Sequence, residues 1–194
     1  MTAKIAYDEG KLTELILYIG ARCGLDEHYG VLKLNKILFY SDFKAFKTLG
    51  RPITGVEYRK YTHGPAPAVM KVLKQKLERN KDVFEYHNPL PNLDADDQPM
   101  SEKRLLPRRE PVITRFTAEQ IAIVDEVIDW LRPKTGKEVS VLTHRHPGWR
   151  HAEMGSEIPY CTALLSETPK PLSAADLKRA RATADRFGTV SAAV

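Results

Sequence analysis

The stretch VLKLNKILFYSDFKAFKTLG, residues 31–50, predicts a helix that is apolar on almost every side. One stripe of apolar side chains recurs at helical spacing and consists of Val31, Leu34, Leu38, Ala45 and Leu49. A second apolar set covers much of the remaining surface and consists of Ile37, Phe39, Tyr40, Phe43 and Phe46. Because such a helix must be buried on all sides, we predict that it lies at the centre of the fold.

The same helix carries polar side chains that its apolar surroundings should partly bury. Asn35 and Asp42 share a face, and buried polar groups need hydrogen-bond partners. His63 precedes a turn and is the partner that we predict for Asp42. An Asp–His pair can be half of a catalytic triad, but no nucleophile motif such as G-x-S-x-G completes one. We therefore favour a structural hydrogen-bond network that holds a strand against the helix.

Further patterns on both sides of this helix define the fold class. Helices are predicted from apolar periodicity and caps over residues 11–23, 65–80, 117–131, 137–147 and 173–188. Thr117 and Gln120 are spaced as a capping box at the start of the third of these helices. In the second of these helices, Pro65 and Pro67 would occupy the first turn. Short strands are predicted over residues 56–63 and 82–87, with a return strand over 103–116. The result is α+β: a helix-dominated single domain of about six helices with a small antiparallel sheet.

Length and composition set limits on the class of protein. The chain has 194 residues and a net charge of +5, which allows an anionic partner. No apolar run approaches the roughly 18 residues that span a bilayer, and residues 1–10 lack the apolar stretch of a signal peptide. We therefore expect a cytoplasmic protein with no membrane partner. The two cysteines, Cys23 and Cys161, show no C-x-x-C spacing, and we expect both to be buried.

The segment HRHPGWRH, residues 144–151, contains three of the six histidines. His144 and His146 would lie about 200° apart on a helix, so they cannot bind one metal ion together. We therefore expect no metal site. We predict instead that His146 ends a helix, where an imidazolium favours the helix dipole, and that Trp149 packs into the core.

Two charged segments are candidate binding surfaces. Residues 88–101, NPLPNLDADDQPMS, contain three prolines and three aspartates and predict a mobile loop. The predicted last helix is basic and carries Lys178, Arg179, Arg181 and Arg186. Such a basic face is usually solvated, although it could also contact phosphates.

Residues 33–70 resemble the core of the Panacea domain family, the SocA-type antitoxins of bacteria and phages. The matching positions are Lys33, Leu34, Asn35, Lys36, Tyr40, Asp42, Gly50, Pro52, Ile53, Thr54, His63, Gly64 and Pro65. The later segments THRHPGWRHA, which includes Trp149, and IPY resemble further parts of the family pattern. The likeness spans roughly residues 10 to 165.

The resemblance implies an antitoxin domain over residues 1–170, and we expect residues 171–194 to form a capped helix packed on it. It implies neutralisation of a toxin, encoded by the adjacent gene, through protein–protein contact, with neither catalysis nor a cofactor. The family-motif residues would then be structural or partner-binding: Asn35, Lys36, Tyr40, Asp42, His63, Gly64, Pro65 and Trp149. We expect the contact surface to include the acidic segment 88–101 or the basic end of the chain.

Two alternatives remain open. One is a DNA-binding regulator of its own operon that uses the basic C-terminal helix, which salt-dependent DNA binding would support. The other is a hydrolase built on His63 and Asp42, which a nucleophile close to a histidine in a deep pocket would support.

Overall fold

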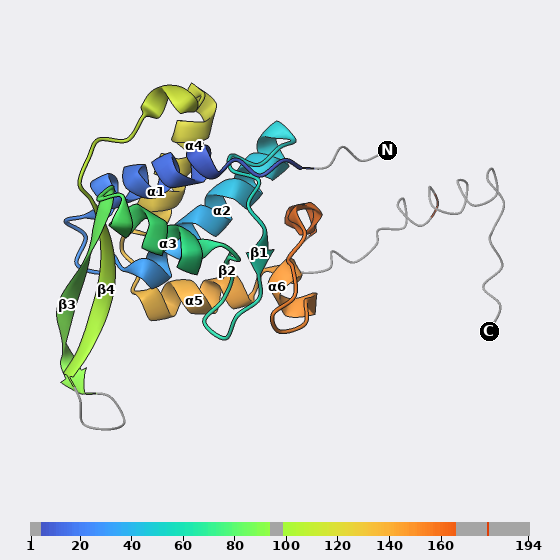
Figure 1. Ribbon diagram of the computed structural model, residues 1–194. Coiled ribbons are helices and arrows are strands. Elements are labelled where there is room, and N and C mark those ends of the chain that lie inside the picture. Colours follow the sequence, from blue (N-terminus) through green and yellow to red (C-terminus); the bar gives the residue numbers. More distant parts are fainter. Residues whose placement is uncertain (1–4, 94–98, 166–177, 179–194) are drawn as a thin grey trace.

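A computed structural model describes residues 5–93, 99–165 and 178 of the chain (Figure 1). The described residues form a helix-dominated α+β fold, as the sequence predicts. The α-helices are α1 (Glu9–Cys23), α2 (Val31–Leu49), α3 (Met70–Arg79), α4 (Ala118–Leu131), α5 (Gly136–His144) and α6 (Pro147–His151). The strands are β1 (Tyr58–Arg59), β2 (Ala66–Pro67), β3 (Val83–Leu93) and β4 (Pro99–Pro107), and two short 3₁₀ helices cover Ile113–Arg115 and Tyr160–Leu164. The predicted helix over 173–188 lies outside the described residues, apart from residue 178.

Helix α2 is the central element, and this prediction is confirmed. It contacts α1, α4, α5, β2, β4 and the 3₁₀ helix at Tyr160–Leu164, which surround it (Figure 1). Leu34, Ile37, Leu38 and Phe39 on this helix are fully buried. The helix ends at Gly50, whose left-handed backbone lets its N–H donate to the carbonyl of Phe46.

Side-chain caps fix where the surrounding helices begin. The predicted capping box at the start of α4 is present, because the Thr117 side chain accepts from the backbone N–H of Gln120 while the Gln120 side chain accepts in return. Thr135 and Glu138 form a second capping box at the start of α5. These caps fix the starts of α4 and α5, and both helices pack against α2.

The segment between α2 and α3 departs from the sequence prediction. Only Tyr58 and Arg59 of the predicted strand pair with another strand, opposite Pro67 and Ala66. Pro65 and Pro67 do not lie in the first turn of a helix, because α3 begins at Met70 and Pro67 belongs to β2. The chain stays extended here, and the N–H of Ala68 donates to the carbonyl of Glu57 at 2.8 Å. This geometry makes a long, irregular turn over residues 60–65.

Strands β3 and β4 form an antiparallel hairpin, which confirms the predicted pairing of 83–87 with 103–107. The hairpin is longer than predicted, because residues 88–93 and 99–101 continue the two strands instead of forming a loop. Residues 94–98 lie outside the described residues. Residues 113–115, predicted as part of the return strand, form a 3₁₀ turn. The hairpin extends away from the helical body (Figure 1).

Candidate functional site

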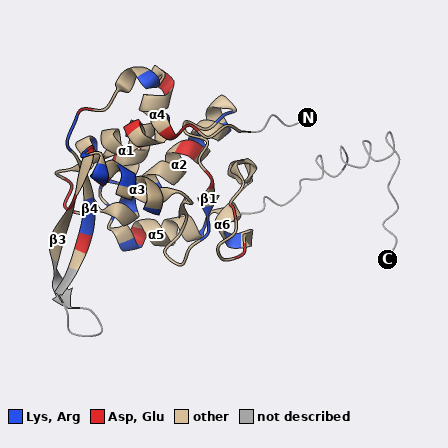
Figure 2. Ribbon diagram, viewed as in Figure 1, with Lys and Arg blue, Asp and Glu red and all other residues tan. Residues whose placement is uncertain are grey.

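Asp42 lies in a buried hydrogen-bond network at the C-terminal half of α2, where it is the acidic residue of the helix (Figure 2). Its Oδ1 atom accepts from the backbone N–H groups of Ile53 and Thr54, both at 2.8 Å. Its Oδ2 atom accepts from the Thr54 hydroxyl at 2.5 Å and the Tyr58 hydroxyl at 2.9 Å. Burial raises the pKa of the Asp42 carboxyl, and these hydrogen bonds oppose the rise.

The network joins four parts of the chain. The Tyr160 hydroxyl donates to the Val56 carbonyl at 2.7 Å and lies 3.4 Å from Oδ2 of Asp42. One carboxylate therefore links α2, the turn at Ile53–Thr54, β1 and the 3₁₀ helix that contains Tyr160. The I-T and I-P-Y segments of the family pattern meet at this carboxylate.

The predicted pairing of Asp42 with His63 is wrong. The His63 side chain is exposed, and its carbonyl accepts from the Ser140 hydroxyl at 2.8 Å. Asp42 is fully buried and its described donors come from other residues. The physical reason is the path of the chain, which passes Asp42 at Ile53–Thr54 and then runs back along α2 before it reaches His63. The described geometry therefore does not bring together the catalytic pair that the hydrolase alternative requires.

Lys33 and Lys36 are two buried lysines on the N-terminal half of α2, and their surroundings differ. Lys33 forms an ion pair with Asp26 at 2.7 Å and also donates to the Arg132 carbonyl at 2.8 Å. Lys36, only 1% exposed, donates to the Pro65 carbonyl at 2.8 Å. Burial lowers the pKa of Lys36 to about 7.

The turn His63–Gly64–Pro65 wraps around Lys36. Gly64 has a φ of +95°, and a Cβ atom there would lie 2.5 Å from Oγ1 of Thr143 and 2.9 Å from Cε of Lys36. Only glycine fits this position, for both its backbone conformation and its close contact with the lysine. Gly64 and Pro65 of the family pattern therefore have a structural explanation: they enclose the Lys36 side chain, while His63 stays exposed.

An open groove of about 640 Å³ lies beside this turn. Its floor and walls come from the first turns of α2, the turn over residues 61–66 and residues 154–155. The apolar part of the lining comes from Val31, Leu32, Ala66 and Met154. Its polar side chains come from Asn35, Lys36, Tyr61, Thr62 and His63. Three family-motif residues, Asn35, Lys36 and His63, therefore meet in one groove. The Oδ1 atom of Asn35 is buried and has no hydrogen-bond partner among the described residues.

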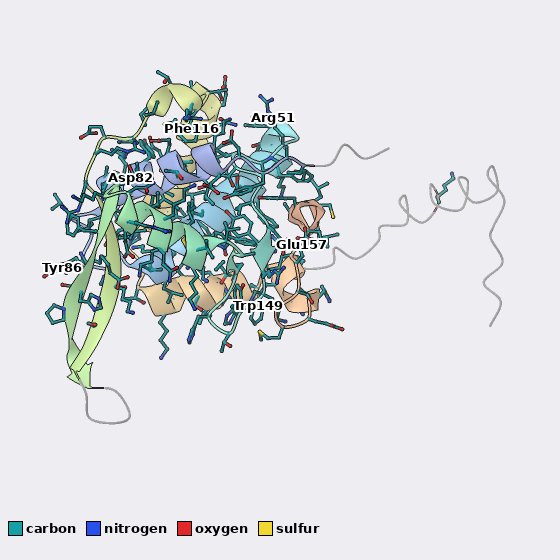
Figure 3. All side chains as sticks on the ribbon, viewed as in Figure 1. Arg51, Asp82, Tyr86, Phe116, Trp149 and Glu157 are labelled. Carbon is teal, nitrogen blue, oxygen red and sulfur yellow. The ribbon has the colours of Figure 1, made fainter. Side chains whose placement is uncertain are left out.

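The histidine-rich segment, residues 144–151, packs against the turn over residues 61–66 but does not line the groove. His144 stacks on Trp149 with ring centroids 3.9 Å apart, and the Lys60 ammonium lies 4.3 Å from the centre of the Trp149 ring. Trp149 lies in α6 and is half-buried at the edge of the core (Figure 3), and its Nε1–H donates to the Tyr61 carbonyl at 3.3 Å. Burial and the nearby charges of Lys36 and Lys60 lower the pKa of His144.

The prediction that His146 ends a helix and carries a positive charge is wrong. It precedes α6, and its Nδ1 atom accepts from the Gly148 N–H at 3.1 Å. Burial lowers the pKa of His146 to about 4, so the ring is neutral near pH 7. A neutral acceptor suits this position because a helix N-terminus disfavours positive charge.

Tyr40 lies on another side of α2, against α4. Its ring meets Trp130 edge to face, with centroids 4.9 Å apart. This family-motif residue therefore packs α2 against α4 and stands outside the groove.

Residues 5–93 and 99–165 contain no group of three or more His, Cys, Asp or Glu that could hold a metal ion. Cys23 is buried, but the prediction for Cys161 is wrong, because its side chain is exposed; both thiols are free. No helix within the described ranges is long and apolar enough to cross a membrane.

The sequence patterns did not identify several residues of the site. Tyr58 and Tyr160 complete the Asp42 network, although the sequence showed Tyr58 only as an aromatic in a predicted strand and Tyr160 only as part of the IPY segment. Lys33 and Asp26 form a buried ion pair across seven positions, and the lysine alone belongs to the motif. A buried charge requires several hydrogen-bond partners, so the burial expected for Asp42 and Lys33 already indicated that further polar residues must surround each of them.

A comparison with models of protein families identifies the family of this chain. Residues 34–150, more than half of the chain, match the family model described as antitoxin SocA-like, Panacea domain. The chain therefore belongs to the Panacea domain family of SocA-like antitoxins. No curated protein and no solved structure gives a significant match. Family membership supports an antitoxin role and suggests a role without catalysis.

Proposed function

We propose that this chain neutralises a cognate toxin by binding it directly, and that the adjacent gene encodes this toxin. The observation that carries the proposal is the family match over residues 34–150. The cell would be a bacterium, or a bacterium carrying a phage, and the complex would form in the cytoplasm. Residues 1–170 would act as the antitoxin domain.

The β3–β4 hairpin is the surface that we propose for the first contact with the toxin. Phe84 and Tyr86 share one face of β3 and are 36% and 47% exposed. Tyr86 points away from the helical body in Figure 3, and the Arg108 guanidinium lies 5.0 Å from the centre of the Phe84 ring. Exposed aromatic side chains beside an arginine are typical of the residues that dominate protein interfaces.

The hairpin alone is too small for a stable complex. A standard interface buries about 800 Å² on each partner, which requires a second contact area on the helical body. The groove between α2 and the turn over 61–66 is a candidate for this second area, because apolar and polar side chains both line it.

The experiment is co-expression with the product of the adjacent gene. If that product is toxic alone, the full chain should restore growth and should co-purify with it. Tyr86→Ser should weaken the complex about tenfold, a typical loss for an interface aromatic. Val141→Ser is the matched control, because Val141 is 49% exposed on α5 and should leave binding unchanged. A harmless neighbour and the absence of any co-purifying protein would refute the proposal.

A further inference from the structure

The Lys36 ammonium lacks a counter-charge in the described part of the chain. Residue Lys36 lines the groove and is almost fully buried, and its ammonium donates to one backbone carbonyl, that of Pro65. An ammonium group has three N–H donors, so two of them have no protein acceptor among the described residues. None of the described residues that line the groove is acidic. A buried cation in this state is costly unless an anion joins it.

A second polar group in the same groove has the opposite need. Oδ1 of Asn35 is a buried acceptor that lacks a described donor. Asn35 and Lys36 are adjacent in α2, and both line the groove. The groove therefore offers an unused cation and an unused acceptor within an otherwise mostly apolar lining. A ligand that satisfies both must supply a carboxylate or similar anion together with an N–H donor.

We propose that this groove binds an acidic side chain of the partner polypeptide, flanked by apolar residues, with Lys36 receiving the carboxylate. This inference rests on the proposed function, because the partner is the toxin. An amide N–H of the bound segment donates to Asn35, and its apolar side chains cover Leu32 and Met154. The groove is open rather than a blind pocket, which fits a segment that passes through it better than a chain terminus.

Synthetic peptides test the groove without the toxin. The probe is acetyl-Gly-Leu-Glu-Leu-Gly-amide, and its matched control replaces Glu by Gln. Binding is followed by the backbone amide signal of Gly64 and the side-chain amide of Asn35 in ¹H–¹⁵N spectra of the full chain. The Glu peptide should bind at least about tenfold more tightly than the Gln peptide, a difference of about 1.4 kcal/mol.

Variants of the groove should remove that difference. Lys36→Met should bind both peptides equally, whereas Lys47→Met, at an exposed position of the same helix, should keep the preference for Glu. Leu32→Glu places a carboxylate one helical turn from Lys36, so it should also abolish the preference. This second variant keeps the test decisive if Lys36→Met fails to fold.

Three results with peptides and the unmodified chain would overturn the inference. Equal binding of the Glu and Gln peptides by the unmodified chain is one, and no binding of the Glu peptide up to about 10 mM is another. Tighter binding of acetyl-Gly-Leu-Leu with a free C-terminal carboxylate would show that the groove takes a chain terminus instead. If the toxin co-purifies equally with wild type and Lys36→Met, this inference fails while the proposed function stands. If no toxin binds, the proposed function fails and the peptides still decide the groove.

Discussion

Lys33 and Lys36 lie about one turn apart on α2 and are almost equally buried, but only the Lys33 ammonium has a carboxylate partner among the described residues. Lys33 has a carboxylate and a carbonyl as acceptors, whereas Lys36 has one carbonyl. Asp42, further along the same helix, also has its hydrogen-bonding capacity filled, because both of its carboxylate oxygens accept hydrogen bonds. Satisfied buried charges hold the fold together, whereas an unsatisfied one lowers stability and is expected where function requires it.

The largest expected effect is at Asp42. Asp42→Ala leaves two backbone N–H groups and the buried Thr54 and Tyr58 hydroxyls without their acceptor. We expect a loss of about 4 kcal/mol in the free energy of unfolding, measured by urea denaturation. Asp125→Ala is the control, because Asp125 is partly exposed and bonds to Tyr18, so it should cost about 1 kcal/mol. An equal loss for the two variants would contradict the network.

Removing the satisfied lysine should have the next largest effect. Lys33→Met removes the cation that pairs with the nearly buried Asp26 carboxylate and the donor to the Arg132 carbonyl. We expect the free energy of unfolding to fall by about 3 kcal/mol. A loss below about 1 kcal/mol would mean that the ion pair does not distinguish this lysine from Lys36.

The turn around Lys36 gives a third prediction. Gly64→Ala should cost about 2 kcal/mol or more, because it combines a left-handed backbone with a Cβ atom only 2.5 Å from the Thr143 hydroxyl. Gly50→Ala has a similar backbone, with φ of +73°, but open space around it, so it should cost about 1 kcal/mol. Equal thermal unfolding curves for the two variants would show that the contact with Thr143 and Lys36 is unimportant.

The smallest effect should be at Lys36. Its pKa falls from the ordinary value of 10.5 to about 7 in the folded chain, so between these values the unfolded chain binds more protons. Stability should therefore rise as the pH rises from 7 to 10.5, and the penalty is present in full below pH 7. Lys36→Met removes this contribution and should leave stability at pH 7 unchanged or higher by about 1 kcal/mol.

Urea denaturation of wild type and Lys36→Met at pH 7 and pH 10 measures this effect. The difference between the two proteins isolates Lys36 from the other groups that titrate in this range. A variant that is several kcal/mol less stable at pH 7 would show that Lys36 is structural, as Lys33 is.

The sequence predicted the features that depend on local patterns. The buried α2 helix, the capping box at Thr117 and the pairing of β3 with β4 all follow from periodicity and short-range hydrogen bonds. The length of the hairpin was missed because Pro89 and Pro91 argue against a strand. Both strands of a two-stranded hairpin are edges, where proline is tolerated.

The partner of Asp42 could not be predicted because it depends on the direction of the returning chain. Asp42 and Lys36 are six residues apart, which is about 9 Å along a helix. The chain passes Asp42 first, at Thr54, and reaches Lys36 only at Pro65. Spacing along the sequence places His63 within reach of either position, and only the structure shows that His63 lies in the groove beside Lys36.

The affinity of Lys36→Met for the toxin that co-purifies with the full chain tests the central claim most directly. We propose that Lys36 binds the partner and lowers the stability of the unbound protein. We therefore predict binding at least about tenfold weaker than that of wild type, from a variant at least as stable at pH 7. Unchanged affinity in this folded variant would contradict this proposal.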